Sequence, residues 1–211
     1  MFEAIKALFK KPEPKLDPVT AYKQRIEREF SRMEAELAAR KLPKDAILPT
    51  LCTIRGVQIS VMNQSDAERY CHHPGESDYT AMVSISDEWY HHAPNVFTTR
   101  PGQDGVKLLC REFFDDNEIG GKNIISVGQA EAIASFIRNR VFAPDSRINR
   151  LIIHCEAGRS RSAAIAAATI RWLGEDDMGF FTSSIYHPNR TVYCRMLDAF
   201  RHIEEAKAHG E

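Results

Sequence analysis

Residues 151–162 read Leu-Ile-Ile-His-Cys-Glu-Ala-Gly-Arg-Ser-Arg-Ser, and this stretch decides the fold. The apolar residues at 151–153 predict a buried strand, and the polar residues after Cys155 predict a tight loop. The alanine-rich run from 163 to 173 predicts a helix. A loop between a strand and a helix can wrap an oxyanion, because its N–H groups point inward and the helix dipole adds positive charge. We therefore expect an anion-binding loop with a cysteine at its base.

The pattern His-Cys-x-x-Gly-x-x-Arg-Ser at 154–162 resembles the signature loop of the cysteine-dependent protein tyrosine phosphatases, especially the small dual-specificity-like members. The resemblance implies a phosphocysteine intermediate, with Cys155 as the nucleophile and Arg161 as the ligand of two phosphoryl oxygens. It also implies that the rest of the loop binds phosphate, namely Glu156, Ala157, Gly158, Arg159, Ser160 and Ser162.

The residue types in the loop suit this chemistry. A thiol is mostly protonated at pH 7, and the loop amides, the helix dipole and Arg161 would favour the Cys155 thiolate. Gly158 allows the backbone to bring successive N–H groups together. Ser162 is placed to donate a hydrogen bond to the sulfur, and the resemblance implies that His154 orients the loop without carrying the proton. Arg159 either raises the local positive potential or contacts substrate, and both readings stay open.

Expulsion of an alkoxide or phenoxide from phosphate needs a proton donor. The resemblance places an aspartate on a movable loop upstream of the cysteine. Here an expected strand at 106–114 runs into Asp115 and Asp116, and a glycine pair follows at 120–121. Asp116 lies 39 positions before Cys155, and the Phe-x-Asp arrangement of related phosphatases favours it as the general acid. Asp115 remains the alternative.

Other chemistries match the sequence less well. Rhodanese-like sulfurtransferases and arsenate reductases use loop cysteines but need no upstream aspartate, and low-molecular-weight phosphatases carry their cysteine near the N-terminus. Lipid phosphatases usually have lysine-rich loops, and Glu156 would repel a polyanionic inositol headgroup. We expect hydrolysis of phosphotyrosine on proteins or peptides, with phosphoserine and phosphothreonine decided by pocket depth. A pseudophosphatase that binds phosphorylated partners, and a phosphatase of a non-protein phosphate ester, are the alternatives.

Composition narrows the setting of this activity. The net charge of −1 is not typical of a nucleic-acid binder, and no apolar run reaches membrane-spanning length. Five scattered cysteines suit a reducing cytoplasm. We expect no metal or other cofactor, because the adjacent pairs His72-His73 and His91-His92 cannot easily share one ion.

The chain divides near its prolines into an N-terminal helical extension, 1–44, and a phosphatase domain, 45–211. Residues 1–11 predict a short amphipathic helix, for which we expect packing or fraying rather than membrane contact. Asp17 predicts the N-cap of a long helix over 18–41. Its apolar stripe consists of Val19, Tyr22, Ile26, Phe30, Met33 and Leu37. The stripe either docks on the phosphatase domain or pairs with a partner or a second subunit.

The remaining pattern alternates strands with helices. We expect strands at 47–54, 57–61, 80–86, 106–114 and 148–154, and helices at 65–71, 126–142, 162–173 and 190–208. This order predicts an α/β fold with a mostly parallel central sheet flanked by helices, similar to the protein tyrosine phosphatases. The site then lies at the carboxyl end of a strand, and we expect residues 187–190 to border it.

Overall fold

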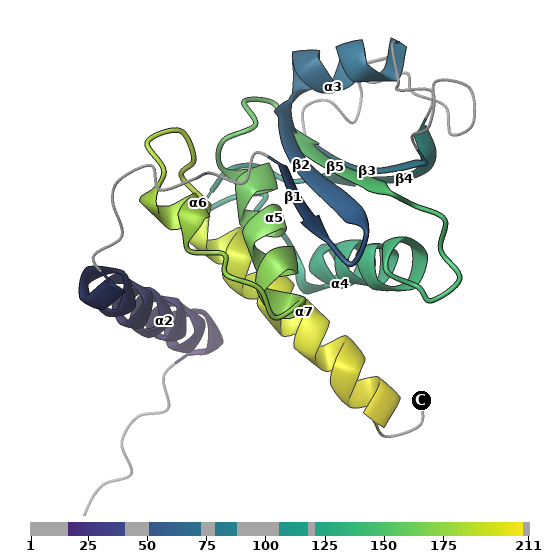
Figure 1. Cartoon of the computed structure of the whole chain (residues 1–211). Coiled ribbons are helices and arrows are strands. Elements are labelled where there is room, and N and C mark those ends of the chain that lie inside the picture. Colours follow the sequence, from purple (N-terminus) through teal and green to yellow (C-terminus); the bar gives the residue numbers. More distant parts are fainter. Residues whose placement is uncertain (1–16, 41–50, 73–78, 88–105, 118–120, 209–211) are drawn as a thin grey trace, which may run out of the picture.

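A computed structural model describes residues 17–40, 51–72, 79–87, 106–117 and 121–208 (Figure 1). The elements in chain order are α2 (Pro18–Arg40), β1 (Leu51–Ile54), β2 (Val57–Asn63), α3 (Gln64–His72), β3 (Thr80–Ser86), β4 (Val106–Phe113), α4 (Val127–Phe136), η2 (Ile137–Val141), β5 (Arg150–Cys155), α5 (Arg161–Trp172), α6 (Gly179–Thr182) and α7 (Arg190–Ala208). The helix expected over 1–11 and the first residues of the strand expected from 47 lie outside the described residues.

The strands form one sheet in the order β1-β2-β5-β3-β4. The pairs β2–β5, β5–β3 and β3–β4 are parallel, and the edge strand β1 is antiparallel to β2. The hairpin between β1 and β2 turns at Arg55 and Gly56, whose φ angles of 50° and 81° suit a two-residue turn. The predicted α/β fold, with a mostly parallel central sheet flanked by helices, is therefore confirmed.

Helices cover both faces of the sheet, with α3 on one face and α4, α5 and α7 on the other (Figure 1). The alternation of side chains along β5 follows this arrangement. Leu151 and Ile153 join the large hydrophobic cluster under α4, α5 and α7, whereas Ile152 packs with Ala67 and Cys71 of α3. Burial on both faces explains why Leu151, Ile152 and Ile153 of β5 are consecutive apolar residues in the sequence.

Several predicted elements are confirmed at or near their expected limits. β3 spans 80–86 and α7 spans 190–208, as predicted. α4 begins with the expected capping box, in which the side chain of Ser126 accepts from the Gln129 amide and the side chain of Gln129 accepts from the Ser126 amide. These elements have strong local signals, namely a run of small and apolar residues for β3, a cap for α4 and a long amphipathic pattern for α7.

Other limits differ from the prediction. β2 continues to Asn63, because the side chain of that residue caps α3 by accepting from the amide of Asp66 at 2.8 Å. The single helix expected over 126–142 ends at Phe136, and the five-residue π-helical turn η2 follows it. The short helix α6 was not predicted from the sequence.

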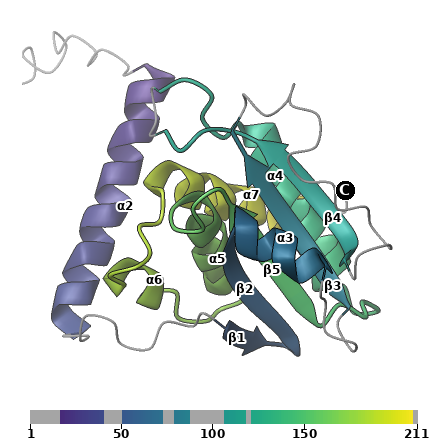
Figure 2. The ribbon, with the colours of Figure 1, turned by 90° about the horizontal axis from the view of Figure 1, so that it is seen from above.

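The long helix α2 packs along α6 and α7 at one side of the molecule (Figure 2). Ile26, Phe30 and Met33 are buried in the same cluster as the helices under the sheet. Val19, in contrast, is 55 % exposed, so the described residues do not cover the first turn of the stripe. The stripe thus docks within the chain, while pairing through 18–41 and the division at residue 44 stay predictions.

No helix in the described ranges is long and apolar enough to span a membrane.

Candidate active site

Cys155 is the last residue of β5, the central strand between β2 and β3. Only 2 % of its surface is exposed. The chain then forms a loop over 156–160 and enters α5 at Arg161. The predicted order of strand, loop and helix is therefore observed, and the cysteine lies at the carboxyl edge of the sheet, where open α/β sheets bind ligands.

The shape of the loop depends on Gly158. Its φ angle is +67°, in the region that favours glycine. A Cβ atom at this position would lie 2.5 Å from the amide nitrogen of Asn63 and 2.6 Å from the carbonyl carbon of Met62. The amide of Gln64 also donates to the carbonyl oxygen of Glu156 at 3.1 Å. The loop is thus held against the junction of β2 and α3 at a separation that only glycine allows.

The side chain of Ser162 lies 3.1 Å from the Cys155 sulfur, within hydrogen-bond distance. When the hydroxyl donates, this contact stabilises negative charge on the sulfur. His154, directly before the cysteine, is buried, and that burial lowers its pKa to about 4. The imidazole is therefore neutral at pH 7, which agrees with an orienting rather than a charged role.

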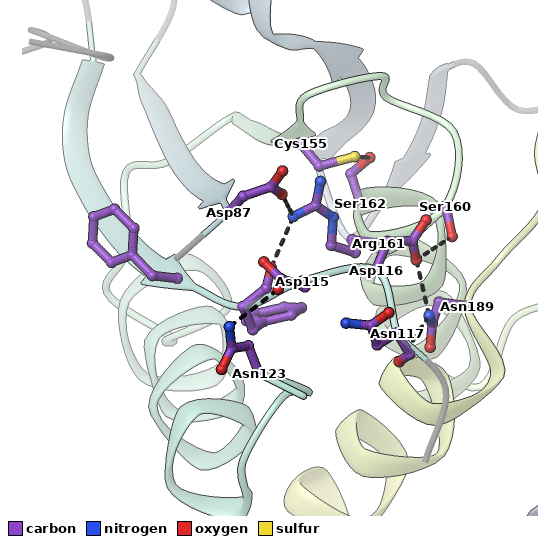
Figure 3. A network of polar contacts seen from close by, with 12 residues as sticks. Asp87, Asp115, Asp116, Asn117, Asn123, Cys155, Ser160, Arg161, Ser162 and Asn189 are labelled. Carbon is purple, nitrogen blue, oxygen red and sulfur yellow. Dashed lines mark hydrogen bonds and ion pairs between the residues drawn. The ribbon is translucent and has the colours of Figure 1, made fainter. Parts of the chain in front are cut away.

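Arg161 begins α5 and is 5 % exposed. Its Nη1 donates to the carbonyl oxygen of Phe114 at 2.8 Å and forms an ion pair with Asp87 (Figure 3). Asp87 follows β3 and Phe114 follows β4, so two neighbouring strand ends hold the guanidinium. The Nε atom of Arg161 is buried and has no hydrogen-bond partner among the described residues. The described residues therefore supply no acceptor for this donor, which leaves it for an oxyanion held by the loop.

Asp87 was not predicted as a site residue from the sequence. The available signal was its position directly after the apolar run 80–86, since the carboxyl ends of parallel strands meet at one edge of a sheet. Its pairing with Arg161 depends on which strands are neighbours, and the spacing along the chain does not contain that information.

The two candidate acids have different partners. Oδ1 of Asp116 accepts from the Ser160 hydroxyl at 2.7 Å and from Nδ2 of Asn189 at 2.8 Å. Oδ2 of Asp115 accepts from Nδ2 of Asn123 at 3.2 Å, and the amide of Asp115 donates to the carbonyl oxygen of Asn123 at 2.8 Å. Figure 3 shows the Asp116 carboxylate turned toward the loop that follows Cys155. This contact favours Asp116 over Asp115 as the candidate general acid.

The segment before α7 is hydrogen-bonded along the same loop. The His187 amide donates to the carbonyl oxygen of Arg159 at 2.9 Å, and Nε of Arg159 donates to the carbonyl oxygen of Ile185, also at 2.9 Å. The Arg159 side chain therefore fixes a neighbouring segment. Among the other loop residues, Glu156 and Ala157 are exposed. Residues 187–190, which we expected to border the site, line a groove together with Asp116 and Ser160.

No group of three or more His, Cys, Asp or Glu side chains suited to a metal ion occurs in the part of the chain that the structure describes. The side chain of His72 and residues 73, 91 and 92 lie outside that part.

No protein-family model matches the chain, and no curated protein matches it. Among the solved structures that are similar to it are the following two. One is Tk-PTP in its active form, with 18 % sequence identity and a TM-score of 0.44, over 75 % of this chain and 99 % of that chain. The other is PTPMT1 in complex with PI(5)P, with 13 % identity and a TM-score of 0.44, over 74 % of this chain and 98 % of that chain.

Proposed function

We propose that the protein is a cysteine-dependent phosphatase that hydrolyses phosphotyrosine, and by the same chemistry phosphoserine or phosphothreonine, on proteins. The observation that carries the proposal is the grouping at the end of β5. The Cys155 sulfur, the proposed nucleophile, lies 3.1 Å from the Ser162 hydroxyl. It also lies beside the buried guanidinium of Arg161, whose Nε has no partner among the described residues. A phosphoryl oxygen would accept from that donor, and the phosphorus would then lie over the sulfur.

In the first step, the Cys155 thiolate attacks phosphorus, an S–P bond forms and the P–O ester bond breaks. Asp116 gives its proton to the leaving oxygen. Both hydrogen bonds to this carboxyl group fall on Oδ1, so Oδ2 is the oxygen that would carry the proton. Arg161 stabilises the charge on the equatorial oxygens in the loose transition state.

In the second step, Asp116 takes a proton from water, and the water oxygen attacks the phosphocysteine. A new P–O bond forms and the S–P bond breaks. Ser162, 3.1 Å from the sulfur, donates its hydrogen bond to the departing thiolate. Phosphate is released, and both catalytic groups return to their starting protonation states. No step requires a metal ion.

Charge near the nucleophile supports a protein substrate. Glu156 follows Cys155 directly and is exposed, so it would repel a headgroup that carries several phosphates. A singly phosphorylated side chain meets less repulsion. Hydrolysis of a phosphotyrosine peptide should therefore exceed hydrolysis of a soluble inositol polyphosphate, measured as kcat/KM for each. A higher kcat/KM for the inositol polyphosphate would mean that the substrate is a non-protein phosphate ester and not a protein.

Phosphate release from p-nitrophenyl phosphate in the presence of EDTA tests the chemistry. We expect activity in the wild type, none in Cys155→Ser, and full activity in Cys52→Ser, which changes a cysteine of β1 outside the loop. An inactive wild type, or activity in Cys155→Ser, would overturn the enzyme. If the wild type is inactive, its calorimetric titration with phosphotyrosine would identify a pseudophosphatase by binding without turnover.

A further inference from the structure

A groove of about 420 Å³ lies between α2 and the segment before α7, beside the proposed active site. Its apolar surface includes Met33 and Leu37 of α2, together with Phe181 and Tyr186. Asp116 and Ser160 line its other side. The volume is within the range of about 300–1,000 Å³ that holds organic ligands in proteins. A group of one or two side chains fits this space.

The groove is continuous with the site. Asp116, the proposed general acid, and Ser160, from the loop after Cys155, are both among its lining residues. Asp116 must approach the oxygen that links phosphate to the rest of the substrate. The part of the substrate that adjoins this oxygen is therefore next to the groove.

The wall that α2 contributes is held in place by the rest of the chain. The Phe30 ring packs edge-on against Phe181 and Tyr193, with centroids 5.7 and 5.9 Å apart. Arg25 forms an ion pair with Asp198 of α7. A surface that is already ordered binds without the entropy loss of ordering.

Charge at the rim favours an apolar rather than an acidic occupant. Nη2 of Arg190 donates to Oε1 of Glu34 at 3.0 Å, and its guanidinium lies over the Phe30 ring, 4.8 Å from the centroid. The positive charge is thus largely balanced within the wall. The Asp116 carboxylate adds negative charge on the opposite side. An acidic group in the groove would therefore meet the Asp116 carboxylate, while Arg190, the arginine of the described lining, is already paired with Glu34.

We propose that this groove binds an apolar side chain next to the phosphorylated residue of a peptide substrate, with α2 as the wall that sets the preference. The proposal rests on the proposed phosphatase function. The lining also contains polar side chains, among them Asp116, Asn189 and Arg190, and these suit the amide groups of a peptide better than an acyl chain. The chain therefore uses α2 as part of its substrate-binding surface.

The test compares two phosphotyrosine peptides that differ only in residues flanking the phosphotyrosine, which are leucine in one and aspartate in the other. We expect the wild type to prefer the leucine peptide by about tenfold in kcat/KM, the scale expected for partial burial of one aliphatic side chain. Leu37→Ser should reduce this preference several-fold, mainly through KM. Val19→Ser, at an exposed apolar position of the same helix, should retain it.

A second pair of variants uses charge and leaves the core untouched. Glu34→Arg places a cation at the exposed rim and should raise kcat/KM for the aspartate peptide by about threefold, the scale of a solvent-screened ion pair. Glu36→Arg makes the same change of charge at an exposed position of α2 outside the groove, and should leave both peptides unaffected.

Equal wild-type rates for the two peptides would contradict the proposed role of the groove in substrate binding. A preference that neither Leu37→Ser nor Glu34→Arg alters would contradict it as well. So would a wild type that prefers phosphatidylinositol phosphate in mixed vesicles and loses that activity in Leu37→Ser. The rate with p-nitrophenyl phosphate reports on the phosphatase function separately. If that rate is zero, fluorescence anisotropy with the same labelled peptides still decides, because equal affinities of the wild type would refute the groove.

Discussion

The two sides of the catalytic loop are built differently. The loop base, defined as His154, Cys155, Arg161 and Ser162, is at most 5 % exposed and belongs to β5 and α5. The rim, defined as Asp116, Ser160 and the groove beside them, is held by side-chain hydrogen bonds from remote segments. Main-chain elements thus fix the groups that would handle phosphate, while replaceable side chains fix the approach to it. Substitutions in the groove wall can therefore change specificity while the loop base stays intact, whereas substitutions at Asp116 change turnover.

The largest effect should come from Arg161→Lys in the loop base. Lysine keeps the charge but lacks Nε and the planar fork, so it cannot hold two phosphoryl oxygens. We expect kcat/KM for p-nitrophenyl phosphate to fall by about 10³, the scale for removal of a donor aimed at transition-state charge. Arg138→Lys, at a surface ion pair with Glu204, is the matched control and should keep wild-type activity. A loss of less than tenfold in the first variant would remove Arg161 from the mechanism.

The pH dependence of the free energy of unfolding should also distinguish the loop base from the rim. Burial lowers the pKa of His154 to about 4, below its ordinary 6.5, so the unfolded chain binds a proton more readily than the folded one. Stability from this residue is fully present above pH 6.5 and is lost as the pH falls toward 4. The loss amounts to about 3 kcal/mol.

Urea unfolding between pH 7.5 and 4 measures this loss, with His154→Asn as the comparison. Burial raises the pKa of Asp177, which acts in the opposite direction at low pH, so the difference between the two profiles is the informative quantity. The wild-type profile should fall more steeply than that of the variant. Parallel profiles would contradict the assignment to His154.

The rim should respond next, through the general acid. Asp116→Asn keeps the shape and an acceptor for Ser160 and Asn189 but removes the proton donor. We expect kcat for a phosphotyrosine peptide to fall by about 10² and kcat for p-nitrophenyl phosphate much less, because a good leaving group needs little protonation. Asp115→Asn should not produce this pattern. If it does, the general acid is the neighbouring residue.

The same contrast explains what could be predicted from sequence. The loop base could be predicted because its residues lie within nine consecutive positions, and Gly158 between them has a local reason in its positive φ angle. β3 and α7 were likewise predicted at their observed limits, because a run of small and apolar residues and a long amphipathic pattern are local signals.

The features that sequence did not predict are those that depend on the tertiary arrangement. Asp87 meets Arg161 only because β3 lies beside β5 in the sheet. The four-residue helix α6 lies next to a buried contact in which the Tyr193 hydroxyl donates to Asp177 at 2.6 Å. The groove exists because α2 docks beside the catalytic loop. The spacing of residues along the sequence does not show which of these segments are neighbours in space.

The smallest effect should come from Asn189, which joins the rim to the fold. Its Oδ1 accepts from the amide of Val192 at 2.9 Å and caps α7, while its Nδ2 donates to Asp116 at 2.8 Å. Asn189→Ser keeps a capping hydroxyl but is too short to hold the carboxylate. Stability should change by less than about 0.5 kcal/mol, and kcat for a phosphotyrosine peptide should fall by about fivefold, as expected for one hydrogen bond.

A double-mutant cycle distinguishes positioning of the acid from a general structural role. If Asn189 acts by orienting Asp116, Asn189→Ser should have no further effect on kcat once Asp116→Asn has removed the proton donor. An equal loss in both backgrounds would mean that Asn189 acts through the end of α7 instead. Melting temperatures of the four proteins exclude unfolding as the cause. Non-additive rates with additive stabilities would therefore locate the effect of Asn189 at the acid and leave the loop base intact.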